Sequence, residues 1–241
     1  LGLEKKRLLD DNMLEATATL KKAGKIRYLA ASSHGPNNME KLLLAAVRSG
    51  HFDLIMPAFN FMKFPAVPKL LGEAKQRGVG VIAMKTLAGA RDSGIELDPA
   101  IFEQAAFKWV LGHAEVDALV VSIKSVRHLN DYLPASGELL AGADRQALDR
   151  YAALHGSEYC RTGCGDCRDS CPDGVDIASI LRYQMYFENY GEEKRAMLAY
   201  AGLNKSGASC LDCLPDSCGS ACSYGLNIGA KLRAAHATLS I

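Results

Sequence analysis

The chain has 241 residues, enough for one large domain or two ordinary ones. Hydrophobic residues make up 49% and charged residues 23%, which is the balance of an ordinary globular protein. The net charge of +1 and the scattered basic residues give no argument for binding to nucleic acid or an anionic membrane, and no apolar run approaches the ~20 residues of a membrane-spanning helix.

Helical and strand patterns alternate over residues 1–130. Helices are expected where apolar residues recur at helical spacing and a glycine or a new strand follows, at 12–24, 37–50, 68–78, from Pro99 onward, and from 126 onward. Strands are expected in the apolar stretches between them, at 25–33, 52–61, 79–89 and 116–125.

Four successive strand–helix units predict an α/β fold with a parallel sheet. The strands are apolar throughout rather than alternating, which is typical of parallel strands covered on both faces. A closed barrel of this type needs eight strands, so the pattern is compatible with half of a barrel or with an open parallel sheet.

Three regions follow from the changes in composition. We expect a strand–helix region over 1–140, a linker helix over 141–158, and a separate module over 159–241. All eight cysteines lie in that last region, and residues 1–159 contain none.

The cysteines form two sets of four, with the spacings C-x3-C-x2-C-x3-C-P and C-x2-C-x4-C-x3-C. The first set is Cys160, Cys164, Cys167 and Cys171, and the second is Cys210, Cys213, Cys218 and Cys222. Each differs at one gap from the C-x2-C-x2-C-x3-C-P motif of bacterial ferredoxins, in which the last cysteine binds the other cluster. The spacing therefore predicts two [4Fe-4S] clusters, each with three thiolates from one set and one from the other.

An internal repeat supports two similar sites. Residues 171–182 (CPDGVDIASILR) and 222–233 (CSYGLNIGAKLR) agree at five of twelve positions. In each copy the last cysteine precedes a glycine, then a capping Asp or Asn, then an amphipathic helix. The residues between the sets are helical in pattern, which indicates a helical two-cluster domain.

Two other interpretations of the cysteines stay open. Four disulfides would suit a small secreted protein, but a long cysteine-free region precedes these. Two structural zinc sites usually take their cysteines as C-x2-C pairs spaced further apart than these.

Several segments resemble the last four strands of aldo/keto reductases: GKIRYLAASSH, DLIMPAFNF, GVGVIAMKTLAGA and VVSIKSVRHLND. The cysteine-rich tail resembles the iron–sulfur extension of one branch of that family. The resemblance implies the C-terminal half of a TIM-type barrel, with four βα units, followed by an α-helical two-cluster ferredoxin-like domain.

The resemblance also implies NADP(H) as a candidate cofactor. Ser32 and Ser33 match positions that hold the nicotinamide amide, Lys85 lies at the mouth of the barrel, and Lys124 with Ser125 matches the region that meets the 2′-phosphate.

Three further residues bear on that site. Met56 and Met84 stand where the family usually has Gln and often has an aromatic ring, and His34, beside the serines, is interpreted as structural. The catalytic tetrad of the family lies in the other barrel half, so no residue here takes those roles.

These observations predict an iron–sulfur oxidoreductase of aldo/keto reductase type, whose clusters carry electrons to or from the barrel site or a partner. The alternative is an electron-transfer or docking subunit without hydride chemistry. We expect a redox partner protein, or a missing N-terminal half-barrel on the same or another chain. Cluster assembly favours the cytoplasm; periplasmic twin-arginine export is the alternative.

Overall fold

The computed structural model describes residues 2–35, 38–62, 66–88, 99–161, 163–213 and 217–240. The chain divides into two compact units, Leu1–Ala152 and Ala153–Ile241, and each is described by itself. No helix in the described part of the chain is both long and apolar enough to cross a membrane.

The first unit alternates helices and strands, as the sequence pattern predicts. In chain order its elements are α1 (Gly2–Leu8), α2 (Asp11–Lys22), β1 (Ala30–Ser33), α3 (Met39–Ser49), β2 (Leu54–Pro57), α4 (Val67–Gln76), β3 (Gly80–Ala83), α5 (Pro99–Leu111), β4 (Ala118–Leu119), α6 (Val126–Tyr132), η1 (Leu133–Ala135) and α7 (Gly142–His155), of which α7 runs past the boundary between the units.

The four strands form one parallel sheet in the order β1-β2-β3-β4. Sequential order is the arrangement of neighbouring strands in an α/β barrel, whereas a doubly wound sheet reverses its order at a switch point. The sheet therefore confirms the α/β class and is consistent with part of a TIM-type barrel.

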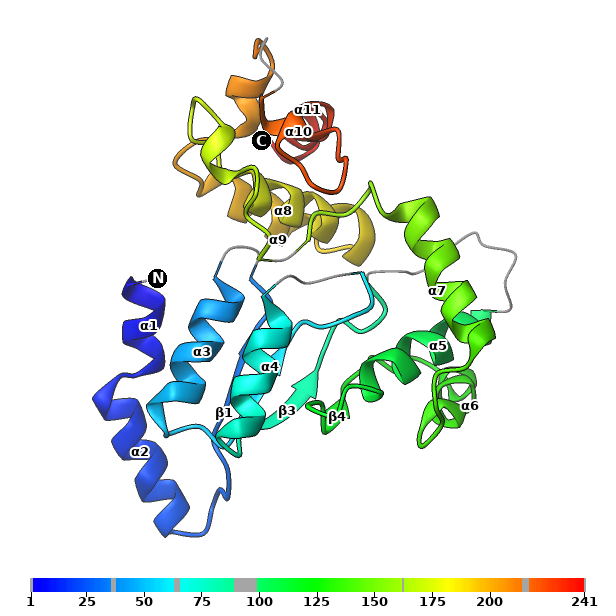
Figure 1. Cartoon of the computed structure of the whole chain (residues 1–241). Helices are drawn as coiled ribbons and strands as arrows, with labels where there is room; N and C mark the ends of the chain where they lie inside the picture. Colours follow the sequence, from blue (N-terminus) through cyan, green and yellow to red (C-terminus); the bar gives the residue numbers. More distant parts are fainter. Residues whose placement is uncertain are drawn as a thin grey trace. The chain divides into compact units, whose positions relative to one another are not determined.

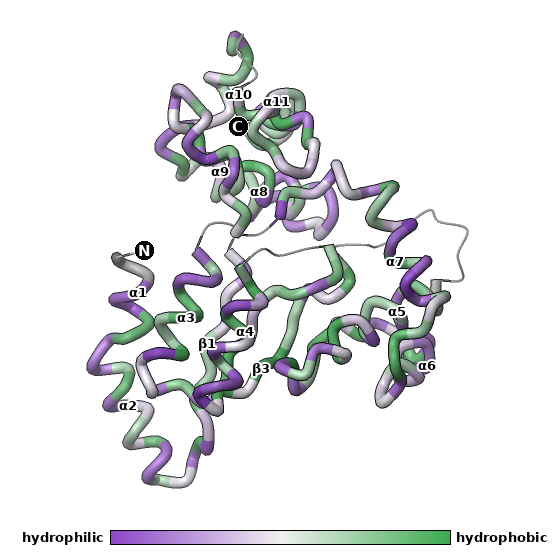
Figure 2. The backbone as a smooth tube through the Cα atoms, in the orientation of Figure 1, coloured by the Kyte–Doolittle hydropathy of each residue, from purple (hydrophilic) through white to green (hydrophobic). Residues whose placement is uncertain are grey.

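One face of the sheet is packed against helices. α3 contacts β1 and β2, α4 contacts β3, and α3 and α4 lie side by side (Figure 1). Hydrophilic and hydrophobic stretches alternate along both helices (Figure 2), since one side of each faces the sheet and the other faces water. The fully buried side chains at this interface include Leu43, Ile55, Leu70 and Val81, and each stabilises the fold by roughly 1.5–3 kcal/mol.

The other face of the sheet is only partly covered, so the expectation that both faces are buried was wrong. Ile55 and Pro57 of β2 are buried, but Leu54 and Met56 between them are only half-buried, and β3 shows the same alternation. Ser32 of β1 is exposed. Four strands cover only an arc, so the face that would look into a closed barrel has no opposing strands against it in the described part of the chain.

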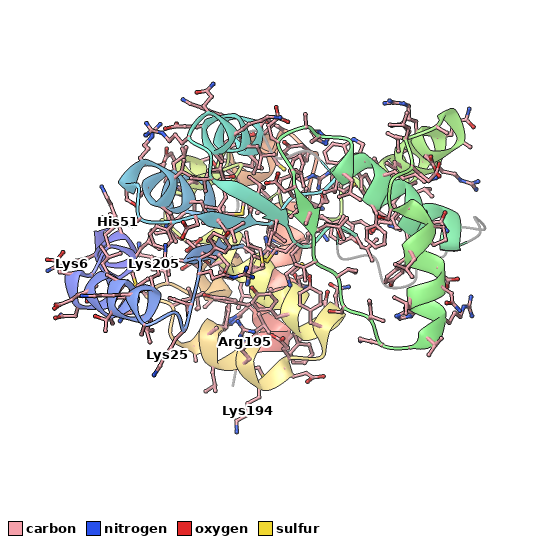
Figure 3. All side chains as sticks on the ribbon, turned by 90° about the horizontal axis from the view of Figure 1, so that it is seen from below. Lys6, Lys25, His51, Lys194, Arg195 and Lys205 are labelled. Carbon is pink, nitrogen blue, oxygen red and sulfur yellow. The ribbon has the colours of Figure 1, made fainter. Side chains whose placement is uncertain are left out.

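The second unit is helical and carries the cysteines. Its elements are η2 (Arg168–Ser170), α8 (Ile177–Tyr190), α9 (Glu193–Ala201), η3 (Gly207–Cys210), α10 (Ser217–Ser220) and α11 (Ile228–Leu239). α8 packs against α9 and α11, with Ile180, Ile228, Leu232 and Leu239 fully buried between them. On α9, Lys194 points outward (Figure 3), while the Arg195 guanidinium lies 5.1 Å from the centre of the Tyr186 ring.

The internal repeat is present in the structure. Asp176 is the N-cap of α8, and its carboxylate accepts from the Ser179 N–H at 3.1 Å. Asn227 is the N-cap of α11, and its side-chain oxygen accepts from the Ala230 N–H at 3.1 Å. The glycines that precede these caps, Gly174 and Gly225, have φ of 63° and 69°. Only glycine adopts this left-handed turn without a steric penalty, so the predicted turn, cap and helix are confirmed in both copies.

Candidate functional site

The carboxyl ends of the four parallel strands lie at one edge of the sheet, and the predicted nicotinamide residues follow those ends. Ser32 and Ser33 close β1 and pair with Met56 and Pro57 of β2. Lys85 follows β3, and Lys124 with Ser125 follows β4. Neighbouring strands are ~4.8 Å apart, so the ends of β1 and β4 are separated by about 14 Å across this edge.

Lys85 has an unusual backbone conformation. Its φ is 59°, which is left-handed and disfavoured for a residue with a Cβ atom. Asn60, after β2, donates from its side-chain nitrogen to the Lys85 carbonyl oxygen at 2.9 Å, and its side-chain oxygen accepts from the Met62 N–H at 3.0 Å. The buried Asn60 side chain therefore holds together the segments that follow β2 and β3.

Sequence reasoning missed Asn60. Its signal was a single amide residue between two aromatic ones, Phe59 and Phe61, directly after a strand. A polar side chain that is buried at a strand end needs hydrogen-bond partners, but its distance from Lys85 in the chain hid which partner it has.

Ser125 has a structural task. Ser125 is the N-cap of α6, and its hydroxyl oxygen accepts from the His128 N–H at 3.2 Å. Lys124 and Ser125 are both exposed. The Lys124 side chain therefore lies where it can meet an anionic group, and a Ser125 substitution would also weaken the start of the helix.

Two buried polar atoms near this edge have no hydrogen-bond partner among the described residues. They are the Glu40 Oε1 atom, in the first turn of α3, and the Thr86 Oγ1 atom, after β3. Burial raises the pKa of the Glu40 carboxyl. Sequence reasoning missed both residues, because Glu40 reads as a polar position of an amphipathic helix and Thr86 as a solvated position after a strand.

All eight cysteines of the second unit lie among the described residues, and none of them forms a disulfide there. They interact in two groups of four. Burial is the main reason that the pKa of Cys160 rises to about 12, and its electrostatic partners include Cys167, Cys164 and Cys222. We call these four residues the first thiol group.

The second thiol group consists of Cys171, Cys210, Cys213 and Cys218. Burial raises the pKa of Cys210 to about 11, and the electrostatic effects of Cys171, Cys213 and Cys218 add to it. In each group, three residues come from one sequence set and one from the other. The Cys167 thiol, whose pKa burial raises to about 11, also interacts with Cys218, so the two groups are neighbours.

Backbone and side-chain contacts surround the two groups. The Val175 N–H donates to the Cys171 sulfur at 3.4 Å. The Ser217 hydroxyl, near Cys218, donates to the Ser170 carbonyl oxygen at 2.9 Å and joins the two sequence sets. The first contact holds the Cys171 sulfur, and the second joins the residues that precede Cys171 and Cys218.

Among the described residues, no three His, Cys, Asp or Glu side chains converge closely enough to hold one metal ion. A single tetrahedral ion would draw four sulfurs to about 2.3 Å from one centre. A cubane cluster presents a separate iron to each thiolate, so its ligands stand further apart.

Comparisons with known proteins give only weak structural matches. No protein-family model and no curated protein matches the chain. Two solved structures of the aldo-keto reductase AKR11C1 from Bacillus halodurans resemble it, the apo form with 19% identity and a TM-score of 0.43 and the holo form with 18% and 0.43. The match covers 59% and 58% of this chain, and 58% and 55% of those chains.

Proposed function

We propose that the protein is an iron–sulfur oxidoreductase of aldo/keto reductase type, with a [4Fe-4S] cluster bound by each thiol group. One observation carries the proposal: the electrostatic interactions of the buried Cys160 and Cys210 thiols divide the eight thiols into two groups of four, and each group takes three cysteines from one motif and the last cysteine of the other. Ferredoxins with two clusters divide their ligands in this way, whereas two zinc ribbons do not require it.

The donors fit such a cluster chemically. Burial and the neighbouring thiols make the thiolate form unfavourable in the metal-free protein, as the raised pKa values of Cys160, Cys167 and Cys210 indicate. Iron would bind the thiolate form and displace the proton, so loading would offset the cost of this crowding. A bound cluster supplies one-electron transfer.

The edge of the sheet supports NADP(H) as the second cofactor. Ser32 and Ser33 would hold the nicotinamide amide, Lys85 would line the mouth of the site, and the exposed Lys124 would meet the 2′-phosphate, with Ser125 beside it. Asn60 would position the Lys85 backbone. Glu40 and Thr86 would offer their unpartnered oxygens to polar groups of a ligand or to water.

Hydride transfer and cluster chemistry differ in electron count. A nicotinamide gives up two electrons together, and a cluster takes one. We therefore propose that a flavin or a redox partner protein accepts the pair and returns single electrons. The half-covered sheet face and the outer strands β1 and β4 support a further proposal, in which the other barrel half is supplied by a longer polypeptide or another chain.

The first experiment measures iron, acid-labile sulfide and the electron paramagnetic resonance spectrum of the dithionite-reduced protein, purified without oxygen. Two cubanes give about eight irons and eight sulfides per chain and a spectrum of two interacting paramagnets. Zinc or disulfide sulfur with no sulfide would refute the proposal. Native mass spectrometry tests the missing half, because an intact 25.9 kDa monomer that is stable alone contradicts it.

The second experiment titrates NADPH and NADH into the protein together with its partner barrel half. NADPH should bind more tightly than NADH, and Lys124→Ala should weaken NADPH binding alone. Arg127→Ala, on the exposed surface of α6, is the matched control. If the wild type and the Lys124→Ala variant bind NADPH with equal affinity, Lys124 does not contact the 2′-phosphate.

An electron-transfer subunit without hydride chemistry is the second candidate. Met56 and Met84 favour it, because neither thioether can replace the hydrogen bonds of Gln or the flat stacking surface of an aromatic ring. Loaded clusters combined with no nucleotide binding would support this function over the first.

A further inference from the structure

The two thiol groups differ in the cations beside them. Arg161 directly follows Cys160, and its guanidinium interacts electrostatically with Cys160, Cys164 and Cys222 of the first thiol group. Although it carries a charge, Arg161 is only 7% exposed. A cation is therefore buried beside three of the four thiols of this group.

Contacts fix the position of Arg161. Its guanidinium donates to the carbonyl oxygen of Gly156 at 2.8 Å and to that of Tyr159. It also lies over the Tyr224 ring, with 4.5 Å between the guanidinium carbon and the ring centre. Tyr224 comes two residues after Cys222, so this contact ties the beginning of the first motif to the end of the second.

The matching positions in the second thiol group lack a buried cation. Leu211 follows Cys210 and is 54% exposed. Lys205, labelled in Figure 3, donates to the carbonyl oxygen of Asp173, two residues after Cys171. Lys205 thus takes the place that Arg161 takes at Tyr224, but it is exposed to water.

The other charges near the two groups follow the same trend. Arg182 and Arg233 occupy matching positions in the repeat, and they interact with Cys160 and Cys210 respectively. Arg182 is half-buried, whereas Arg233 is exposed. Asp166 opposes these cations beside Cys164, but its carboxylate is exposed and accepts from the Ser223 hydroxyl.

Burial decides which of these charges matters most. At equal distance, the interaction between two charges is about four times stronger at an effective dielectric constant of 20 than in water, and dissolved salt weakens the exposed charges further. The buried Arg161 therefore outweighs the exposed Asp166, Lys205 and Arg233. A positive charge beside a cluster favours its reduced form, which carries one more electron.

We propose that Arg161 makes the first thiol group the preferred position of an added electron, so that the cluster bound there has the higher reduction potential. With both clusters bound, one electron would pass from the reduced cluster at the second thiol group to the oxidised cluster at the first, with no change in bonds or protons. This inference rests on the proposed function.

The test is a potentiometric titration of the anaerobic protein, followed by electron paramagnetic resonance. The wild type should show two one-electron steps, and Cys222→Ala should remove the step at higher potential. Arg161→Gln should lower the reduction potential of that step by at least about 59 mV, which corresponds to a tenfold change in the equilibrium constant for adding one electron. Arg161→Lys should lower it less, and Lys205→Gln, the matched control, should leave both steps nearly unchanged.

A second measurement needs no variant at Arg161. Raising the salt concentration should move the potential of the second thiol group more than that of the first, since Arg161 beside the first is buried whereas Lys205 and Arg233 beside the second are exposed. The inference fails, and the proposed function stands, if the fully loaded Arg161→Gln protein has unchanged potentials. The same holds if the potentials of both steps depend equally on salt. A wild type without acid-labile sulfide overturns the proposed function as well.

Discussion

The Asn60 side chain donates a hydrogen bond to the Lys85 carbonyl oxygen across 2.9 Å and so joins the carboxyl ends of two neighbouring strands. Asn60 is 4% exposed, so water cannot replace the bond. We expect Asn60→Ala to lower the free energy of unfolding by about 1–3 kcal/mol, because buried polar groups lose their partner. Urea denaturation measures this loss. The exposed Asn12→Ala should change it by less than ~0.5 kcal/mol, and equal effects would contradict the role of Asn60.

The left-handed backbone of Lys85 predicts that glycine stabilises the fold more than alanine at this position, the reverse of the usual order in a helix. At φ 59° a Cβ atom costs roughly 1–2 kcal/mol, so Lys85→Gly should be more stable than Lys85→Ala. At the exposed helical position Lys41 the order should be the usual one, with alanine ahead by ~1 kcal/mol. Thermal unfolding of the four variants compares them. Alanine ahead at both positions would mean that Lys85 carries no strain.

The crossed thiol groups predict which cysteine pairs share a cluster. Replacing Cys160 and Cys222 together by alanine should remove one cluster and leave about half of the iron and sulfide. Replacing Cys160 and Cys171 together should disturb both clusters, although these two residues belong to one sequence motif. Iron analysis and the spectrum of the reduced protein measure both results. The opposite pattern would assign each motif its own cluster.

The Glu73 carboxylate predicts a pH-dependent contribution to the stability of the first unit. Glu73 on α4 accepts from Arg48 on α3 at 2.7 Å and from Arg77 at 3.2 Å, and these guanidinium groups lower its pKa from 4.5 to about 2. A lowered folded-state pKa stabilises the fold above pH 4.5 and loses that contribution as the pH falls through about 2.

Glu73→Gln should therefore lower the melting temperature at pH 6, and the difference from the wild type should shrink as the pH falls from about 4.5 to about 2. Glu15→Gln, at an exposed position on α2, is the control. A difference for Glu73→Gln that stays constant over this range would mean that the ion pair with Arg48 contributes nothing.

Local features of the protein could be read from the sequence. The spacing of the cysteines, the glycines before α8 and α11, and the Asp176 and Asn227 caps each involve residues within one or two turns of chain. The apolar periodicity of α3 and α4 and the alternation of strands and helices are local in the same sense. Their physical causes, left-handed glycine turns, unpaired helix-end N–H groups and amphipathic faces, act over a few residues.

Only the tertiary structure decided which distant groups meet. It buried Arg161 against Tyr224 and brought Asn60 to Lys85. It also left one face of the sheet half-covered, where the apolar strands had predicted burial on both. Such contacts close long loops, which costs conformational entropy. Whether packing and burial offset that cost depends on the whole unit, so a short stretch of sequence does not reveal which contacts form.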